Sequence, residues 1–353
     1  MPDLPDIETA TIPTARINTC VRWVRDRDDA DPVVFVHGNV SSSPFFFPAM
    51  QHLPERYRPI AVDLRGFGGT DTAPVDATRG LRDFSDDVLA ALDALDLPRA
   101  HLVGWSMGGG VVMRAAIDAP DRINSLTLIN PVSPCGFGGT RGLDGRLLSP
   151  DGAGSGGGTA NPDFVQALAT GDTSADSPSS PRSVLRSFYV APGWDGEDEE
   201  MYVASMLSTA VGDDNYPGDS VPSRAWPGIA PGRRGVLNTM APTHLDLSGI
   251  VDIEPKPAIL WVRGELDQIV SDASAMDLAQ LGALGVVPGY PGDAVAPPQP
   301  MVSQTRSVLD GYASAGGRYR EVVIAGAGHS PHIEDLPAFL EALVAHLDGA
   351  TDE

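Results

Sequence analysis

Hydrophobic residues follow two different spacings along this chain, and the way these spacings alternate predicts an α/β fold. Apolar runs at residues 32–38, 59–64 and 101–103 are typical of strands that are buried on both faces of a parallel sheet, and residues 123–129 predict a further strand. Between the second and third runs, residues 81–97 show helical spacing, with one apolar face formed by Phe84, Val88, Leu89, Leu92 and Leu95. This order of strands and helices predicts a parallel sheet built from crossover connections.

Both ends of the chain extend this pattern. Residues 7–25 alternate more loosely between apolar and polar positions, which predicts an antiparallel pair of strands with Pro13 near the turn. Near the other end, the largely apolar residues 257–264 predict a further core strand, and residues 319–324 predict the last strand. A closing amphipathic helix is predicted over residues 336–347, with an inward face formed by Phe339, Leu340, Leu343 and Leu347.

The pattern breaks between residues 131 and 255, which are rich in Gly, Pro, Ser and Asp. Helical spacing returns only at residues 163–168, 181–189 and 199–211. Because a bare loop of this length is rare, we expect a helical cap, and a disordered insertion is the alternative, particularly for residues 136–158. The predicted domains are therefore a core of residues 1–130 and 256–353 and a cap or lid insertion of residues 131–255.

The charge of the chain narrows its possible partners. The 353 residues include 47 Asp and Glu against 24 Lys and Arg, which gives a formal charge of −23, and Lys256 is the only lysine. Such a charge disfavours nucleic acid and anionic membranes as partners. An acidic, lysine-poor surface resembles that of proteins from salt-loving organisms. A high-GC genome would explain the missing lysines but not the excess of aspartate, so we predict a halophilic protein.

Other features bear on location and cofactors. Cys20 and Cys135 lie far apart in the sequence, which fits neither a disulfide framework nor a thiolate metal site. The acidic N-terminus has no apolar segment like that of a signal peptide, and no run of 18 apolar residues occurs. We therefore expect a cytoplasmic protein without a metal, and the sequence does not indicate its oligomeric state.

A candidate nucleophile lies between a predicted strand and a predicted helix. Residues 104–108 form the pattern G-x-S-x-G around Ser106, directly after the apolar run 101–103 and before the helical residues 109–116. In that context the serine occupies a strained turn that exposes its hydroxyl beside the positive end of the helix. Small neighbours are needed where Cβ atoms would collide, and Gly104 and Gly108 supply them. A serine that merely caps a buried helix is the alternative.

A serine hydroxyl needs a base, and the base needs a carboxylate that fixes its tautomer. His329 follows the last predicted strand directly, where a loop can hold it over the carboxyl edge of the sheet, and His332 is its nearest rival. Asp267 follows the strand that ends at residue 264 and leaves the sheet at the same edge. Glu265 and Asp272 are its neighbours, with surface charge as their ordinary role.

Two backbone N–H groups are also needed to stabilise the developing oxyanion. Met107 follows the nucleophile and supplies one of them, and Asn39 supplies the other from the loop after His37 and Gly38. With these pieces in their order along the chain, the sequence resembles the α/β-hydrolase superfamily. The resemblance covers residues from about 7 to 130 and 256 to 348. It implies a mostly parallel eight-stranded sheet flanked by helices, with a helical cap inserted after the sixth strand.

The loop at residues 37–43 separates subfamilies. Asn39, followed by three serines, is similar to the halide-binding loop of haloalkane dehalogenases. Those enzymes and epoxide hydrolases use an aspartate nucleophile that forms an alkyl ester. Because this chain has Ser106, whose alkyl ether could not be hydrolysed by the same route, both activities are set aside.

The expected function is hydrolysis of carboxylic esters or lactones through an acyl-enzyme, by Ser106, His329 and Asp267 and without a cofactor. Hydrolysis of a C–C bond in a dicarbonyl compound, perhydrolysis of small acids, and a binding or receptor protein with little turnover are the alternatives. The expected partner is a small ester-type molecule bound by the cap residues Phe188, Tyr189, Trp194, Met201 and Trp226. Packing of the cap onto the core would equally explain the apolar cap residues. The acidic run at residues 195–200 is expected to disfavour anionic substrates.

Overall fold

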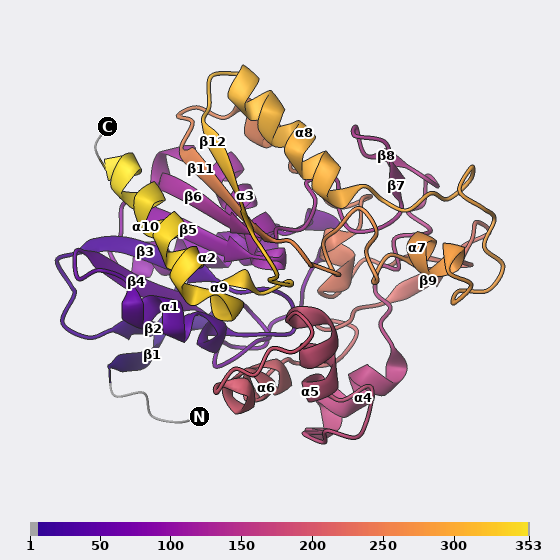
Figure 1. The fold of residues 1–353 in the computed structure, drawn as a ribbon, viewed down its shortest axis with the longest axis horizontal. Coiled ribbons are helices and arrows are strands. Elements are labelled where there is room, and N and C mark those ends of the chain that lie inside the picture. Colours follow the sequence, from indigo (N-terminus) through magenta and orange to yellow (C-terminus); the bar gives the residue numbers. More distant parts are fainter. Residues whose placement is uncertain (1–5, 352–353) are drawn as a thin grey trace.

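Eight strands form one sheet in the computed structural model, which describes residues 6–351 (Figure 1). In chain order they are β1 (Ile7–Pro13), β2 (Asn18–Val24), β3 (Asp31–Val36), β4 (Tyr57–Val62), β5 (Ala100–Trp105), β6 (Ile123–Ile129), β11 (Ala258–Gly264) and β12 (Tyr319–Ile324). Across the sheet their order is β1-β2-β4-β3-β5-β6-β11-β12. Only the β1–β2 and β2–β4 pairs are antiparallel. The predicted mostly parallel sheet is confirmed.

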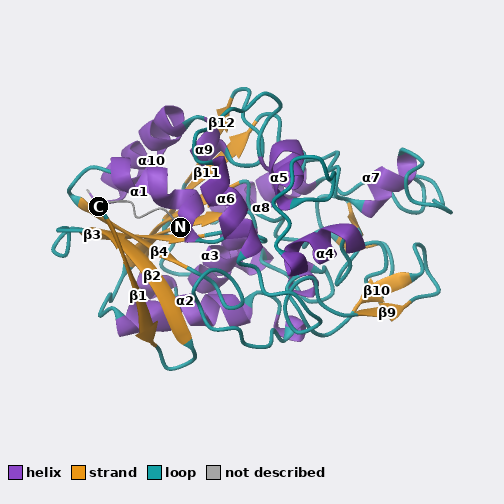
Figure 2. Ribbon diagram, turned by 90° about the horizontal axis from the view of Figure 1, so that it is seen from below, coloured by secondary structure: helices purple, strands orange, loops and turns teal. Residues whose placement is uncertain are grey.

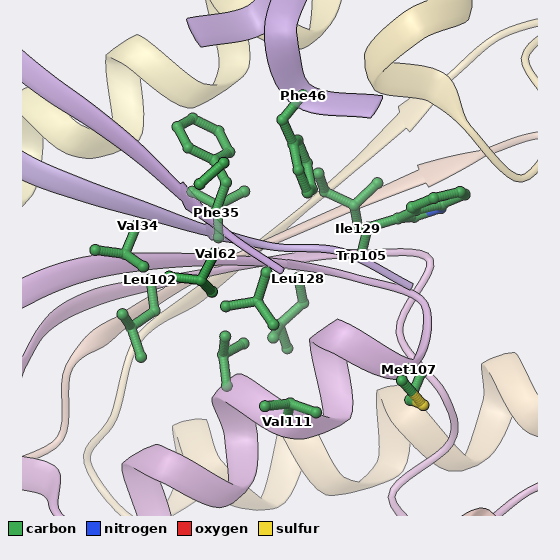
Figure 3. Packing of buried hydrophobic residues seen from close by; sticks show 14 of the residues in the cluster. Val34, Phe35, Phe46, Val62, Leu102, Trp105, Met107, Val111, Leu128 and Ile129 are labelled. Carbon is green, nitrogen blue, oxygen red and sulfur yellow. The ribbon is translucent and has the colours of Figure 1, made fainter. Parts of the chain in front are cut away.

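Helices cover both faces of the sheet, which explains why its central strands are continuously apolar. On one face lie α1 (Phe47–His52) and α10 (Leu336–Thr351), and on the other lie α2 (Arg82–Ala94) and α3 (Met107–Asp118), as Figure 2 shows. Figure 3 shows Phe46 on the first face and Val111 of α3 on the second, with Phe35 and Leu102 between the layers. All four of these side chains have no exposed surface.

The helix α8 (Met301–Ser314) runs beside β12 and was not predicted from the sequence (Figure 1). Its buried face mixes apolar Val308 and Leu309 with polar Gln304 and Thr305. The Gln304 amide can be buried without loss of hydrogen bonds, because it donates to Thr140 and Gly142 and accepts from Ser133. Polar residues that are paired inside the protein hide the apolar periodicity on which sequence analysis depends.

The segment between β6 and β11, called here the inserted segment (residues 131–255), contains several short elements. They are β7 (Thr140–Arg141), β8 (Arg146–Leu147), α4 (Pro162–Thr170), α5 (Pro181–Val184), a π-helical turn (Leu185–Tyr189), α6 (Glu199–Leu207), β9 (Ser220–Pro222) and β10 (Ile229–Pro231). The three α-helices pack on one another (Figure 1). Residues 136–158 include the β7–β8 pair and hydrogen-bonded turns, so they are not structureless.

After β11 come α7 (Leu278–Ala283) and, beyond α8 and β12, the short helix α9 (Pro331–Glu334). Within residues 6–351, no helix combines the length and the apolarity needed to cross a bilayer. The loops after β3, β5, β6, β11 and β12 all leave the same edge of the sheet, because these strands are parallel. This edge carries the candidate site.

Candidate active site

Ser106 lies on a sharp turn between β5 and α3. Its backbone has φ 56° and ψ −119°, a conformation that residues other than glycine rarely adopt. A Cβ at Gly104 would lie 2.3 Å from the carbonyl oxygen of Gly108, and a Cβ at Gly108 would lie 2.2 Å from that of Val36. Glycine is therefore required at both positions by the close approach of backbone atoms.

His329 and Asp267 come together across the parallel neighbours β11 and β12. The His329 Nδ1 lies 3.0 and 2.9 Å from the two carboxylate oxygens of Asp267, and both side chains are buried. The Asp267 Oδ1 also accepts the backbone N–H groups of Ile269 and Val270, at 2.8 and 3.1 Å. Because an ionised carboxylate only accepts hydrogen bonds, Nδ1 donates and Nε2 remains free to act as a base.

The backbone of His329 is held by two side chains from neighbouring strands. Its carbonyl oxygen accepts the indole N–H of Trp105 and the amide of Asn130, each at 2.8 Å. Asn130 in turn accepts the N–H of Gly264 at 3.2 Å. Asn130, which directly follows β6, carries no negative charge and cannot act as the acid. It instead links the end of β11 to the His329 loop.

A cavity of about 370 Å³ lies beside Ser106 and His329, and both residues line it. Most of its apolar wall comes from the inserted segment, through Phe137, Phe164, Val184, Phe188, Tyr189, Tyr216, Leu237 and Met240. Asp, Glu, Lys and Arg are absent from the lining. A largely apolar cavity with a few polar groups at one point is typical of a small-molecule site.

The structure corrects part of the predicted lining. Phe188 and Tyr189 line the cavity, whereas Trp194, Met201 and Trp226 do not. Trp194 packs on Tyr202 with ring centroids 6.0 Å apart, and Met201 is buried in α6. Trp226 packs on Tyr290 and donates to the carbonyl of Pro288 at 3.0 Å. These apolar side chains are used to pack the inserted segment, which the sequence pattern does not distinguish from lining a cavity.

The acidic run at residues 195–200 does not line the cavity. Two of its three glutamates are paired with arginines of the same segment. The Glu199 carboxylate accepts from Arg182 at 2.8 Å and from Arg186 at 2.5 Å, and Glu200 accepts from Arg182 at 2.8 Å. The uncharged lining is itself unfavourable for an anion, because it contains no Lys or Arg side chain.

Sequence analysis missed the rest of the lining. Ile269 and Met276 lie on the loop that follows β11, and Leu278 begins α7. Tyr216 and Met240 lie in irregular or short helical parts of the inserted segment. These positions belong to no common helix face or strand, so no periodic signal connects them.

The two expected oxyanion donors both adjoin Ser106. Met107 is the first residue of α3, so its N–H has no acceptor one turn earlier in the helix. Asn39 lines the cavity, and its carbonyl accepts the Tyr189 hydroxyl at 2.9 Å. A Cβ on the preceding residue, Gly38, would lie 3.0 Å from the Cβ of Ser106, which shows how closely this loop approaches the serine.

Three other histidines are excluded from the cavity lining by their positions. The His37 Nε2 accepts the N–H of Leu64 at 2.9 Å, and His101 pairs with Ser125 at 2.7 Å. His332 is fully buried, and neither of its ring nitrogens has a hydrogen-bond partner in the described part of the chain. The pKa of His332 is lowered to about 3, mainly by burial and to a lesser extent by the nearby His329.

The structure offers no arrangement suited to a metal ion. Across residues 6–351, no group of three or more His, Cys, Asp or Glu side chains could hold one. Cys20 and Cys135 are both free, and burial is the main cause that raises the pKa of each thiol to about 11. Neither thiol is therefore poised to act as a ligand or nucleophile at neutral pH.

Comparison with known proteins identifies relatives of parts of this chain. A family model described as the alpha/beta hydrolase fold matches residues 31–152. A Variovorax paradoxus protein, provisionally named carbamate hydrolase RutD, is 38% identical over 127 residues, which are 36% of this chain and 47% of that protein. The chain thus spans about half the length of this relative.

Solved structures match over nearly the whole chain. The carboxylesterase CesB from Bacillus subtilis has a TM-score of 0.59 at 14% identity and covers 98% of this chain and 93% of its own. The 2-hydroxy-6-oxo-6-phenylhexa-2,4-dienoate hydrolase from Rhodococcus has a TM-score of 0.60 at 16% identity, with 97% of this chain and 99% of that chain covered. At these identities the likeness shows a shared fold.

Proposed function

This chain is an α/β-hydrolase-fold protein, and on that premise we propose that it is a serine hydrolase of neutral, apolar carboxylic esters or lactones. One observation carries the proposal. Ser106, on its strained turn, lines the same cavity as His329, whose ring is paired with the carboxylate of Asp267. A nucleophile, a base and a group that orients the base are the parts that acyl transfer requires.

In the proposed reaction, Ser106 Oγ attacks the ester carbonyl while the His329 Nε2 takes its proton. The N–H groups of Asn39 and Met107 donate to the carbonyl oxygen as it becomes negative. Protonated His329 then donates to the leaving alcohol, which leaves an acyl group on Ser106. His329 next activates water to release the acid, and Asp267 holds the tautomer and the imidazolium throughout.

The uncharged lining supports a neutral substrate. A carboxylate that entered this cavity would lose its hydration without gaining a cation as partner, which is strongly unfavourable. One structural relative is named as the hydrolase of a dienoate, which is an anion. The cavity of this chain has no cationic side chain to pair with such a group, so the ester or lactone reading is favoured over C–C bond hydrolysis.

The test is hydrolysis of 4-nitrophenyl butyrate by the wild type and by Ser106→Ala. Loss of the nucleophile should lower kcat/KM by roughly 10⁴- to 10⁶-fold, with an unchanged circular dichroism spectrum. A burst of nitrophenol followed by steady turnover would identify an acyl-enzyme and distinguish an enzyme from a binding protein. If Ser106→Ala kept more than a tenth of the wild-type turnover, the proposed function would be wrong.

A further inference from the structure

A second buried carboxylate lies beside the His329 loop. Glu334, the last residue of α9, accepts hydrogen bonds from three backbone N–H groups. Its two oxygens lie 3.0 and 2.9 Å from the nitrogen of Gly328, and one of them lies 3.1 Å from that of Ser330. The third donor is the N–H of Ala191 in the inserted segment, at 2.5 Å. Two of the three donors therefore flank His329, and the third belongs to another part of the chain.

The packing at this contact leaves no room for a larger residue at position 328. A Cβ on Gly328 would lie 2.8 Å from the nitrogen of Ala191 and 3.3 Å from the Glu334 Oε1. Among the described residues, this carboxylate accepts hydrogen bonds from backbone N–H groups and forms no ion pair with an arginine or lysine. The inserted segment, the His329 loop and α9 thus meet at a single carboxylate.

We propose that Glu334 is a positioning residue for the hydrolysis, because it fixes the backbone on both sides of His329 and ties that loop to the inserted segment. This inference rests on the proposed function of Ser106, His329 and Asp267. The tie reaches the cavity, because Tyr189 lies two residues before Ala191. Tyr189 lines the cavity, packs edge-on against His329 with ring centroids 6.1 Å apart, and donates to the carbonyl of Asn39.

The charge of Glu334 also acts on His329. Burial raises the pKa of Glu334, while its backbone hydrogen bonds and its interaction with His329 oppose that rise. Asp267, His332 and Tyr189 are the other titratable groups around His329. Burial raises the pKa of Tyr189 and lowers that of His332 to about 3, so both stay neutral near pH 7.

The experiment compares full-length wild type, Glu334→Gln, Glu334→Asp and Glu341→Gln in ester hydrolysis across a range of pH. Glu341 is an exposed residue of α10, so its variant is matched in chemistry but not in place. Glu334→Gln should lower kcat by about 10- to 100-fold with little change in KM, because small displacements of a catalytic group have effects of this size. Glu334→Asp keeps a carboxylate but shortens its reach, so its kcat should also fall, and Glu341→Gln should match the wild type in kcat and KM.

Hydrogen exchange provides a readout that does not depend on activity. Peptides that cover residues 188–193 and 326–332 should exchange faster in Glu334→Gln than in the wild type or Glu341→Gln. If the wild type shows no turnover that depends on Ser106, the proposed function fails, while the exchange data still report whether Glu334 makes the tie.

Two results would overturn the inference. They are wild-type kinetics in Glu334→Gln and unchanged exchange in both peptides. If Glu334→Gln does not fold, the same kinetics and exchange are measured on Glu334→Asp. Its shorter side chain cannot reach all three N–H groups, so it also weakens the contact. Wild-type kcat and exchange in Glu334→Asp would then overturn the inference, and a lowered kcat with faster exchange would support it.

Discussion

At the scale of single residues, the candidate site depends on side chains that hold other side chains. Asp267 receives the His329 Nδ1 together with two backbone N–H groups, so its carboxylate is fixed before it orients the ring. Asn130 and Trp105 fix the His329 backbone in the same way. A group whose position is set in advance loses little entropy when it reacts. Side chains that do not contact the substrate therefore also determine the geometry of this site.

Replacement of the acid tests this arrangement. Asp267→Asn keeps the size of the side chain but can donate to Nδ1, which favours the wrong tautomer of His329. We expect kcat to fall on the order of 10³- to 10⁴-fold. Asp272→Asn is the matched control, because Asp272 accepts from the N–H and hydroxyl of Ser303 in α8 and should affect turnover little. Steady-state hydrolysis measures both, and the reverse outcome would make Asp272 the acid.

The rival histidine gives a prediction on pH. The folded pKa of His332, about 3, lies below the unfolded value of about 6.5, so the unfolded chain takes up the proton first as pH falls. The folded state is thus destabilised below about pH 6.5, by up to about 1.4 kcal/mol per pH unit for this one group. His332→Leu removes this uptake. It should gain stability relative to the wild type between pH 6.5 and 5, in chemical denaturation at each pH.

The same variant checks the choice of base. His332 packs against Phe46, Trp105 and Phe339 and does not line the cavity, so His332→Leu should keep ester hydrolysis within about fivefold of the wild type, as expected for an apolar replacement of similar volume. His329→Leu should abolish it. Loss of activity in His332→Leu, or a pH dependence of stability like that of the wild type, would show that His332 has a role that its unpartnered ring does not indicate.

At the scale of elements, the inserted segment does two separate things. The helix α6 packs on the loop after β3, where the Ser42 N–H donates to the Ser205 hydroxyl at 2.8 Å and Tyr202 lies 4.7 Å from Phe45, between ring centroids. The π-helical turn instead directs Phe188 and Tyr189 into the cavity wall. Substrate preference should therefore respond to changes in the turn and not to changes in the packing side chains.

The uncharged wall predicts discrimination against anions. A neutral butyrate ester should exceed a succinate half-ester of the same leaving group by roughly 100-fold or more in kcat/KM, because the buried carboxylate would have no partner. The measurement is a kcat/KM series in which acyl length and charge vary separately. Equal rates for the two esters would mean that the acyl group does not occupy this cavity.

Two variants test whether the acyl group of the substrate occupies this cavity. Phe188→Ala widens the cavity and should change the preference among acyl lengths by about 10-fold, as loss of apolar contact with the substrate does. Trp226→Ala removes an aromatic ring that packs on Tyr290, away from the cavity, and should leave the preference unchanged. If Trp226→Ala altered the preference among acyl lengths and Phe188→Ala did not, the acyl group would not bind in this cavity.

At the scale of the whole molecule, the excess of carboxylates is distributed unevenly. Buried arginines are neutralised locally, as where Arg65 meets Asp87 at 2.6 Å and Arg22 meets Asp63 at 2.5 Å. The exposed carboxylates have weaker partners, and the side chains of Asp28 and Glu200 are 77% and 78% accessible. Exposed pairs contribute little to stability, so the formal charge of −23 is felt mainly as repulsion between surface groups.

This repulsion predicts stabilisation by salt. The Debye length falls from about 10 Å at 0.1 M to about 3 Å at 1 M, so repulsion between surface carboxylates should weaken. We expect Tm to rise between low salt and molar KCl, measured by calorimetry at neutral pH. Sucrose at equal osmolality controls for exclusion of solutes from the surface. A flat or falling Tm would contradict the halophilic interpretation and favour a high-GC genome as the source of the composition.

Much of the fold follows from local pattern. The sequence predicted six parallel strands to within two residues, and the central ones are largely apolar because they are covered on both faces. The turn at Ser106 was readable because the collisions at Gly104 and Gly108 are local consequences of its backbone. His329 and Asp267 could be chosen because parallel strands bring the loops that follow them to one edge.

Only the tertiary structure decided the rest. Trp226 and Phe188 are both aromatic residues of the inserted segment, and the sequence does not distinguish their roles. The path of the folded chain places Phe188 in the cavity lining and packs Trp226 on Tyr290. Gln304 is polar yet buried, because Ser133, Thr140 and Gly142, which pair with its amide, lie more than 160 positions away in the sequence. In the sequence, Glu334 resembles any surface glutamate. Only the folded chain brings the backbone N–H groups of Ala191 and Gly328 to its carboxylate. A local pattern records whether a side chain avoids water, whereas its partner is set by segments that are distant in sequence and close in space.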